Sequence, residues 1–217
     1  MALMFYQWGL FTLPWWWIIV ALIVCTGIIN AYNFMDGING ITGGYSLVVL
    51  VALAYINEAV VPFVEQDFIL TVLCSVFVFN FFNFRKQAKC FAGDVGSVSI
   101  AFVILFLIGM LIIRTENFSW IVLLAVYGVD SVLTIIHRLM LHENIGLPHR
   151  KHLYQLMANE LEIPHVVVSL IYMTSQAIII VGYLLTPGWG YCYLLGTIVI
   201  LSMVYILFMK KYFHLHP

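Results

Sequence analysis

The sequence predicts an all-α polytopic membrane protein, a helical bundle with about seven transmembrane helices. Of its 217 residues, 64% are hydrophobic and only 9% are charged, and the mean hydropathy is +1.05. Soluble domains carry about 25% charged residues, so this composition excludes an ordinary globular protein. We expect residues 1–217 to form a single transmembrane domain.

Each expected helix is an apolar run close to the ~20 residues that a helix needs to cross a bilayer. Polar or glycine-rich segments separate the runs, and four scattered cysteines have neither metal nor disulfide spacing, as expected of packing residues. The expected spans are residues 13–30, 41–57, 68–84, 97–113, 118–137, 164–185 and 190–209.

The basic residues predict the orientation of the bundle. If the spans alternate in direction, the loops at about 31–40, 85–96 and 138–163 share one side with the C-terminal tail, and this side holds eight of the nine Lys and Arg residues. The positive-inside rule places that side in the cytoplasm, which gives an N-out/C-in topology. Trp15–Trp17 and Trp189 then lie at the outer interface. The net charge of −1 gives no reason to expect a nucleic-acid partner.

The stretch NAYNFMDGINGITGG (residues 30–44) carries polar groups directly after an apolar run. Asn30, Asn33 and Asp36 follow one another at three-residue spacing, which keeps them near one face of a helix. A carboxylate inside the bilayer costs at least about 2.5–3.5 kcal/mol and is by default a candidate functional group. Asp36 is therefore a candidate catalytic residue. The alternative is a helix that simply ends at Gly37, with Asp36 in interfacial water.

A second polar segment, CFAGDVGSVSIAF (residues 90–102), places Asp94 between two glycines ahead of an apolar run. Ser97 is expected to cap the helix that begins there. Free amides at a helix start suit a phosphate, and a carboxylate beside them suits Mg²⁺, which shares phosphate oxygens with one or two carboxylates. The alternative is a glycine turn that Asp94 caps.

The third segment is the longest loop, about 138–163, which contains the basic run His149, Arg150, Lys151 and His152. Arg and His donate well to phosphate oxygens. Two alternatives remain: a zinc site at the His149-x-x-His152 spacing, and an interfacial basic helix that touches membrane lipid.

All three segments fall on the expected cytoplasmic side. A transporter is expected to place polar groups at the middle of the membrane, on broken helices. Polar groups at the inner interface favour instead an enzyme that acts between a soluble phosphate-bearing substrate and a membrane lipid.

In order and spacing, NAYNFMDGINGITGG, FAGDVGS and HRKHLYQL resemble the signature segments of the polyprenyl-phosphate N-acetylhexosamine-1-phosphate transferases. The resemblance implies transfer of an N-acetylhexosamine 1-phosphate, such as GlcNAc 1-phosphate, from a UDP-sugar to undecaprenyl phosphate. UMP is released, Mg²⁺ or Mn²⁺ is the cofactor, and a cell-surface polysaccharide is initiated. It also implies the bacterial inner membrane, with the active site facing the cytoplasm.

The resemblance assigns roles residue by residue. Asp94 matches the metal-binding and catalytic Asp, and Phe91 matches the aromatic residue that packs near uracil. Asn33 and Asp36 match the Asn-x-x-Asp-Gly pair of the catalytic cleft. Arg150 and His152, with His149 beside them, match the loop that closes over the diphosphate or sugar.

The sequence departs from the family pattern in three ways. Asn39 stands where many relatives have a second Asp, and Tyr154 stands where many have a second His. The Asp-Asp motif that relatives usually carry on earlier helices does not occur in this sequence. A partner fragment that carries those helices is therefore an expected partner, and a homodimer is a second expectation. The alternative function is a non-catalytic or truncated relative that needs such a fragment, or that binds lipid or nucleotide-sugar without turnover.

Overall fold

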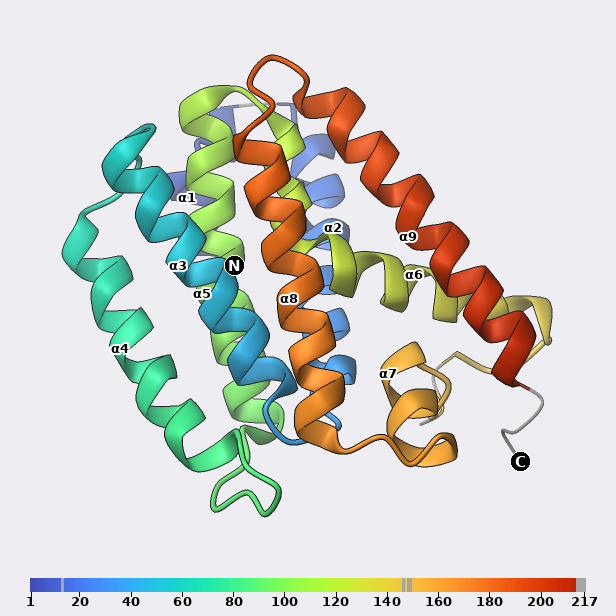
Figure 1. Cartoon of the computed structure of the whole chain (residues 1–217). Helices are drawn as coiled ribbons and strands as arrows, with labels where there is room; N and C mark the ends of the chain where they lie inside the picture. Colours follow the sequence, from blue (N-terminus) through green and yellow to red (C-terminus); the bar gives the residue numbers. More distant parts are fainter. Residues whose placement is uncertain (13, 146, 148–149, 214–217) are drawn as a thin grey trace.

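The computed structural model describes residues 1–12, 14–145, 147 and 150–213 (Figure 1). Among these residues the regular secondary structure is helical, with no strand. Seven helical segments are long and apolar enough to span a membrane, which confirms the predicted polytopic helical fold. They are α2 (Trp16–Met35), α3 (Ile41–Ala59), α4 (Gln66–Asn83), α5 (Gly93–Thr115), η2 (Phe118–Leu124) continued by α6 (Ala125–Met140), α8 (His165–Leu184) and α9 (Gly190–Tyr212).

Shorter helices complete the described chain. The N-terminal α1 (Ala2–Gln7) and η1 (Leu10–Thr12) precede α2, and α7 (Leu153–Gln155) with the π-helical η3 (Leu156–Glu160) lies in the loop between α6 and α8. The predicted long loop therefore contains a short helix with buried residues, among them Tyr154, Leu156 and Met157.

The core forms around α3. Its side chains Tyr45, Leu53 and Ile56 are fully buried, and it packs against α4 on one side and α8 on the other. By contrast, α4 and α9 expose apolar side chains such as Phe81 and Leu207. Such outward apolar faces suit contact with lipid tails, where burial of apolar surface against water no longer drives helix association.

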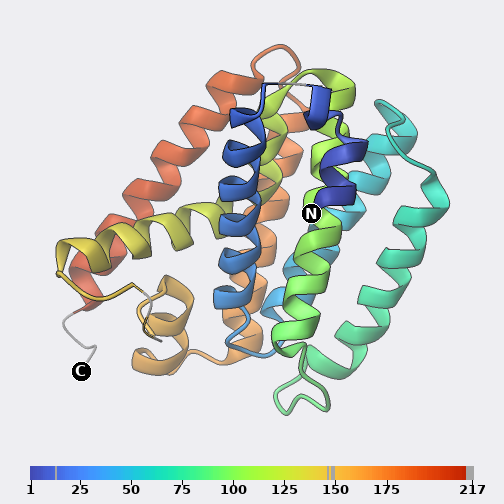
Figure 2. The same ribbon diagram turned by 180° about the vertical axis from the view of Figure 1, so that it is seen from behind.

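The three polar segments lie at one end of the bundle. Figures 1 and 2 show the α2–α3 turn, the α4–α5 loop and the α7 region together at that end, with the α3–α4 and α8–α9 turns at the other. We call the first the motif end. The exposed rings of Trp15, Trp16 and Trp189 belong to the opposite end, as the expected alternation of the helices requires. Which end faces the cytoplasm stays a prediction.

The expected single helix over 118–137 is broken in two. The η2 segment is 3₁₀, the chain leaves helical geometry at Leu124 (φ −117°, ψ 14°), and α6 then runs across the bundle (Figure 1). The fully buried Gln176 of α8 fills the break: its amide donates to the Val122 carbonyl at 2.9 Å, and its Oε1 accepts from the Val126 N–H at 3.1 Å. A side chain thus satisfies backbone groups that a broken helix would leave without partners in lipid.

Candidate functional site

The end of α2 is joined to the start of α5 by one short hydrogen bond. The hydroxyl of the fully buried Ser97 donates to Asn33 Oδ1 at 2.6 Å. The expected helix over 97–113 begins earlier than predicted, at Gly93, so Ser97 lies inside α5 and is not its cap. This earlier start places Asp94 in the first turn of α5, where the helix dipole favours a negative charge.

Two carboxylates lie near each other at this junction. Asp36 follows the last residue of α2 and is partly buried, whereas Asp94 is exposed. Burial raises the pKa of the Asp36 carboxyl, and the charge of Asp94 raises it further. The Thr42 hydroxyl and the backbone N–H of Gly93 act in the opposite direction by favouring the charged form. The structure thus brings together Asn33, Asp36 and Asp94, as the order of the segments predicts.

Phe91 lies in the loop that leads into α5, with its side chain 74% exposed. It lines a cavity of about 410 Å³ between α3, α4 and α5. Thr42, Ser46 and Ser99 also line this cavity, but the hydroxyl oxygens of Thr42 and Ser46 are buried. A ring-shaped ligand at Phe91 would therefore meet mainly apolar walls. Ala92 and Gly96, which lie on either side of Asp94 in the sequence, also line the cavity, so it lies next to that carboxylate.

Asn39 holds the α4–α5 loop against the start of α3. Its side-chain amide donates to the carbonyls of Arg85 and Lys86 at 3.1 and 3.2 Å, and Asn83 Oδ1 accepts from the Gly40 N–H at 2.7 Å. An aspartate cannot donate hydrogen bonds when it is ionised. The amide at position 39, which departs from the family pattern, therefore has a structural use in this chain.

The third segment reaches the first through Tyr154. Its hydroxyl donates to the Phe34 carbonyl at 2.8 Å, and its ring closes over Gly37, where a Cβ would overlap the tyrosine oxygen. His152 lies beside it, with ring centroids 5.9 Å apart, and 6.4 Å from the Phe34 ring. All three polar segments thus meet at the motif end.

His152 is 1% exposed and pairs with a carboxylate that sequence reasoning did not select. Its Nδ1 lies 3.4 Å from Oδ1 of Asp130 in α6, which is 4% exposed. The signal in the sequence was a polar stripe at the end of the expected span 118–137, where Asp130 and Thr134 are followed by Arg138 at the four-residue spacing of a helix face. Asp130 and Thr134 do share a hydrogen bond, at 3.2 Å.

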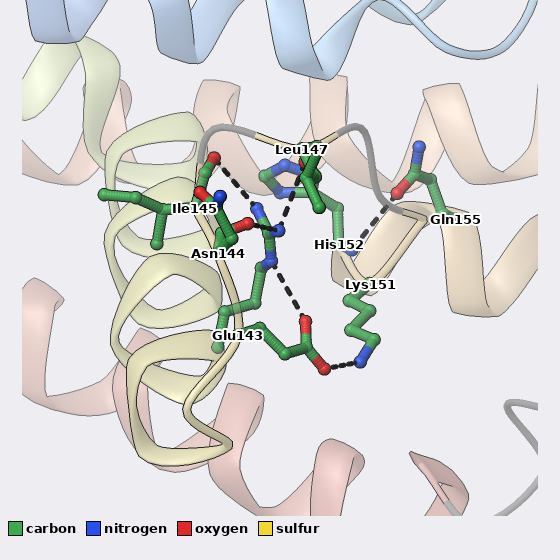
Figure 3. Close-up of polar contacts among 8 residues, drawn as sticks. Glu143, Asn144, Ile145, Leu147, Lys151, His152 and Gln155 are labelled. Carbon is green, nitrogen blue, oxygen red and sulfur yellow. Dashed lines mark hydrogen bonds and ion pairs between the residues drawn. The ribbon is translucent and has the colours of Figure 1, made fainter.

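The basic run of the third segment is divided among different partners (Figure 3). Lys151 forms an ion pair with Glu143, and Glu143 also bonds to the buried Arg138, 3.2 Å away. Arg138 further donates to three carbonyls of the loop, those of Asn144, Ile145 and Leu147. The described part of this run thus presents Arg150 as an exposed cation, while His149 lies outside the described residues.

Two observations bear on metals. Within the described residues no group of three or more His, Cys, Asp or Glu side chains is placed to hold a metal ion. Zinc sites usually have three or four such protein ligands. Mg²⁺ needs only one or two carboxylates, with substrate phosphates and water as its other ligands. Asp36 and Asp94 supply such carboxylates, so the residues present fit a magnesium ion that is also held by substrate phosphates and water.

Comparison with known proteins identifies the family. Residues 2–114 match the family described as glycosyl transferase family 4. The chain belongs to glycosyl transferase family 4.

Bacterial relatives agree with this assignment. The chain is 29% identical over 153 residues to a probable undecaprenyl-phosphate N-acetylglucosaminyl 1-phosphate transferase of Bacillus subtilis, which covers 68% of this chain and 42% of that protein. It is 34% identical over 92 residues to a phospho-N-acetylmuramoyl-pentapeptide-transferase of Lactiplantibacillus plantarum, covering 42% of this chain and 28% of the relative. A protein of the same name from Thermotoga petrophila is 31% identical over 121 residues, which are 56% of this chain and 38% of that protein. The chain thus spans about two-fifths or less of the length of these relatives.

Proposed function

We propose that this chain forms the catalytic end of an enzyme that transfers an N-acetylhexosamine 1-phosphate, such as GlcNAc 1-phosphate, from a UDP-sugar to undecaprenyl phosphate. UMP is released, and the product initiates a cell-surface polysaccharide. The observation that carries the proposal is the meeting of three segments at one end of the bundle, through the Ser97–Asn33 and Tyr154–Phe34 hydrogen bonds. Membership of glycosyl transferase family 4 supports the same reaction class.

The carboxylates suit phosphoryl transfer. Asp94 would hold Mg²⁺ or Mn²⁺ at the start of α5, with Asp36 next to it. When bound, the divalent cation neutralises charge on the phosphate oxygens. A lipid phosphate monoester is mostly dianionic at neutral pH, since its second pKa is about 6, so Asp36 needs to orient the nucleophile more than to deprotonate it.

The bond changes are those of an in-line displacement. An oxygen of the lipid phosphate forms a bond to the phosphorus next to the sugar, and the bond between the two phosphates of the UDP-sugar breaks. The leaving group is UMP. In this arrangement Phe91 stacks near the uracil, Asn33 holds the cleft, and Arg150 and His152 act on the diphosphate or sugar. The same role is proposed for His149, which lies outside the described residues.

An apolar groove suits the lipid chain. It has a volume of about 350 Å³ between α2, η2–α6 and α9, and its lining includes Ile28, Ala31, Tyr32 and Val132. Tyr32 directly precedes Asn33, so the groove leads to the first polar segment. A polyprenyl tail in this groove would present its phosphate at the motif end.

The decisive experiment measures UMP release from UDP-N-acetylglucosamine and undecaprenyl phosphate with Mg²⁺, using the chain as it stands. Release that depends on both substrates supports the proposal. If UMP is released only when a segment with the Asp-Asp motif is co-expressed, the result supports an enzyme made of two parts. Silence in both cases would favour a non-catalytic relative that binds lipid or nucleotide-sugar.

A matched pair of variants tests the metal role. Asp94→Asn should abolish metal-dependent turnover, whereas Asp67→Asn should leave it intact. Asp67 is also an exposed carboxylate in the first turn of a spanning helix, α4, but it belongs to the opposite end of the bundle. Activity retained in Asp94→Asn would remove this residue from the metal site.

The proposed membrane is the bacterial inner membrane, with the motif end in the cytoplasm. Single cysteines in place of the exposed residues Lys86 and Glu116 mark the two ends of the bundle. In a background without native cysteines, an impermeant thiol reagent added to intact cells should label position 116 and not position 86. Labelling of position 86 alone would reverse the orientation.

A further inference from the structure

The carboxylate of Asp130 is buried at the junction of α6, α7 and α8, and the proposed roles above do not use it. Removing a carboxylate from water is costly unless other groups pair with it and donate hydrogen bonds to it. Asp130 has four such partners. Tyr172 donates its hydroxyl to Oδ2 at 2.6 Å, while Oδ1 faces the Leu153 N–H at 3.1 Å, the Thr134 hydroxyl at 3.2 Å and His152 Nδ1 at 3.4 Å.

The chemistry of these partners determines the state of the imidazole. An ionised carboxylate only accepts hydrogen bonds, so the 3.4 Å contact of Nδ1 with Asp130 is attractive when Nδ1 carries the proton. The backbone N–H of Gln155 also faces the His152 side chain, as in a capping box, and this second contact needs a ring nitrogen with a lone pair. The tautomer of His152 therefore decides which of the two contacts governs the imidazole. When Nδ1 carries the proton of a neutral imidazole, Nε2 is the nitrogen with the lone pair. A carboxylate behind a histidine is a common device for fixing tautomer and ring orientation.

The pair is mechanically connected to the carboxylates of the site. Asp130 also accepts from the backbone N–H of Leu153, so it holds the first residue of α7 together with the histidine before it. One residue further on, Tyr154 bonds to the Phe34 carbonyl, two residues before Asp36. A change in the position of His152 relative to α6 would therefore also move the backbone of the first polar segment near Asp36.

We propose that Asp130 is a positioning residue: it fixes His152 in the Nδ1–H tautomer and in one ring orientation, so that Nε2 is the nitrogen directed to the substrate. In the neutral imidazole Nε2 accepts from a sugar hydroxyl, and only in the imidazolium does it donate to a phosphate oxygen. The role in turnover rests on the proposed transferase function, whereas the tautomer does not. The competing possibility is that Asp130 serves only to anchor α7 through Leu153.

The first measurement is therefore independent of activity. The protein is labelled with ¹⁵N-histidine, and the ring nitrogens of His152 are assigned by loss of their signals in His152→Gln. At mildly alkaline pH the wild type should show the Nδ1–H tautomer. Asp130→Asn should shift it towards Nε2–H, and Tyr172→Phe, which removes only the bond to Oδ2, should keep it. An Nε2–H tautomer in the wild type, or one that Asp130→Asn leaves unchanged, overturns the proposal without need of an active enzyme.

The second measurement is a double-mutant cycle on UMP release. Asp130→Asn should lower kcat by at least about tenfold, because a carboxylate that fixes a histidine tautomer has a large effect on turnover. The change in KM for the UDP-sugar should be much smaller, and Asp130→Asn/His152→Gln should be no slower than His152→Gln alone. Effects that multiply would show that Asp130 acts independently of His152 and would overturn the positioning role. If every variant and the wild type are silent, the transferase proposal fails, and the tautomer still decides whether Asp130 fixes the imidazole.

Discussion

Replacing Gln176 by leucine tests whether one buried amide holds the break between η2 and α6. Leucine keeps most of the side-chain volume but leaves the Val122 carbonyl and the Val126 N–H without their partners. Each unsatisfied buried polar group costs about 1–3 kcal/mol, so the two together cost about 2–6 kcal/mol. The phenol of Tyr45, which donates to Gln176 Oε1 at 2.7 Å, loses its acceptor as well. We therefore expect Gln176→Leu to destabilise the fold by at least about 2 kcal/mol.

Two measurements check this value. For a domain of this size, about 2 kcal/mol lowers Tm by at least about 4 °C. If opening is local, the same loss weakens protection of the Val126 amide from hydrogen exchange by about 30-fold. The control is Thr174→Val on the same helix, since the exposed Thr174 bonds only within α8. A Gln176→Leu protein with the Tm and Val126 protection of Thr174→Val would refute the account of the break.

Three further predictions concern the motif end. Gly37→Ala forces the new Cβ against the Tyr154 hydroxyl, and overpacking of about 1–3 kcal/mol should lower Tm by roughly 2–12 °C, less so when combined with Tyr154→Phe. Asn39→Asp removes two donated hydrogen bonds, worth about 0.5–1.5 kcal/mol each, so amide exchange in the α4–α5 loop should accelerate; unchanged exchange would contradict the role of the amide. The hydrogen bond from Lys151 holds the pKa of Glu143 below its usual value of 4.5. The ion pair therefore contributes fully to the stability of the loop above pH 4.5, and this contribution is lost as the pH falls through the lowered pKa of Glu143 in the folded protein. Proteolysis of the loop after α6 should increase over that acidic range in the wild type and be independent of pH there in Glu143→Gln.

The arrangement of the bundle was largely predictable from the sequence because it depends on length and charge. Apolar runs near ~20 residues fix where the chain crosses, and an alternating path then places segments 30–44, 90–102 and 138–163 at the same end. That the first two segments meet follows from this alternation together with the packing of α2 against α5. The direct contact between Asn33 and Ser97 could not be predicted from the sequence. The sequence predicts Ser97 as a helix cap, whereas in the structure it lies inside α5.

The surroundings of the third segment could not be predicted for a different reason. The sequence predicts one exposed cationic surface formed by His149, Arg150, Lys151 and His152, because sequence alone does not show which of these side chains are buried. In the fold, Lys151 is paired and His152 is buried on a carboxylate from a helix that begins 27 residues earlier. Residues that are similar and adjacent in the sequence thus differ in burial and partners, and the tertiary contacts alone determine which of them are buried or paired.

The break at Leu124 explains how that contact arises. A continuous helix over 118–137 would run parallel to the bundle axis, and its polar side chains Asp130 and Thr134 would then face lipid or the apolar core. Because α6 runs across the bundle instead (Figure 1), the same face lies against α8, α9 and the α7 loop, where Tyr172 and Tyr205 bond to Asp130 and Thr134. The opposite face exposes Val132 towards the apolar groove and the surrounding lipid. A helix that reads as one transmembrane span thus holds the histidine loop on its polar face and borders the groove proposed for the lipid tail on its apolar face.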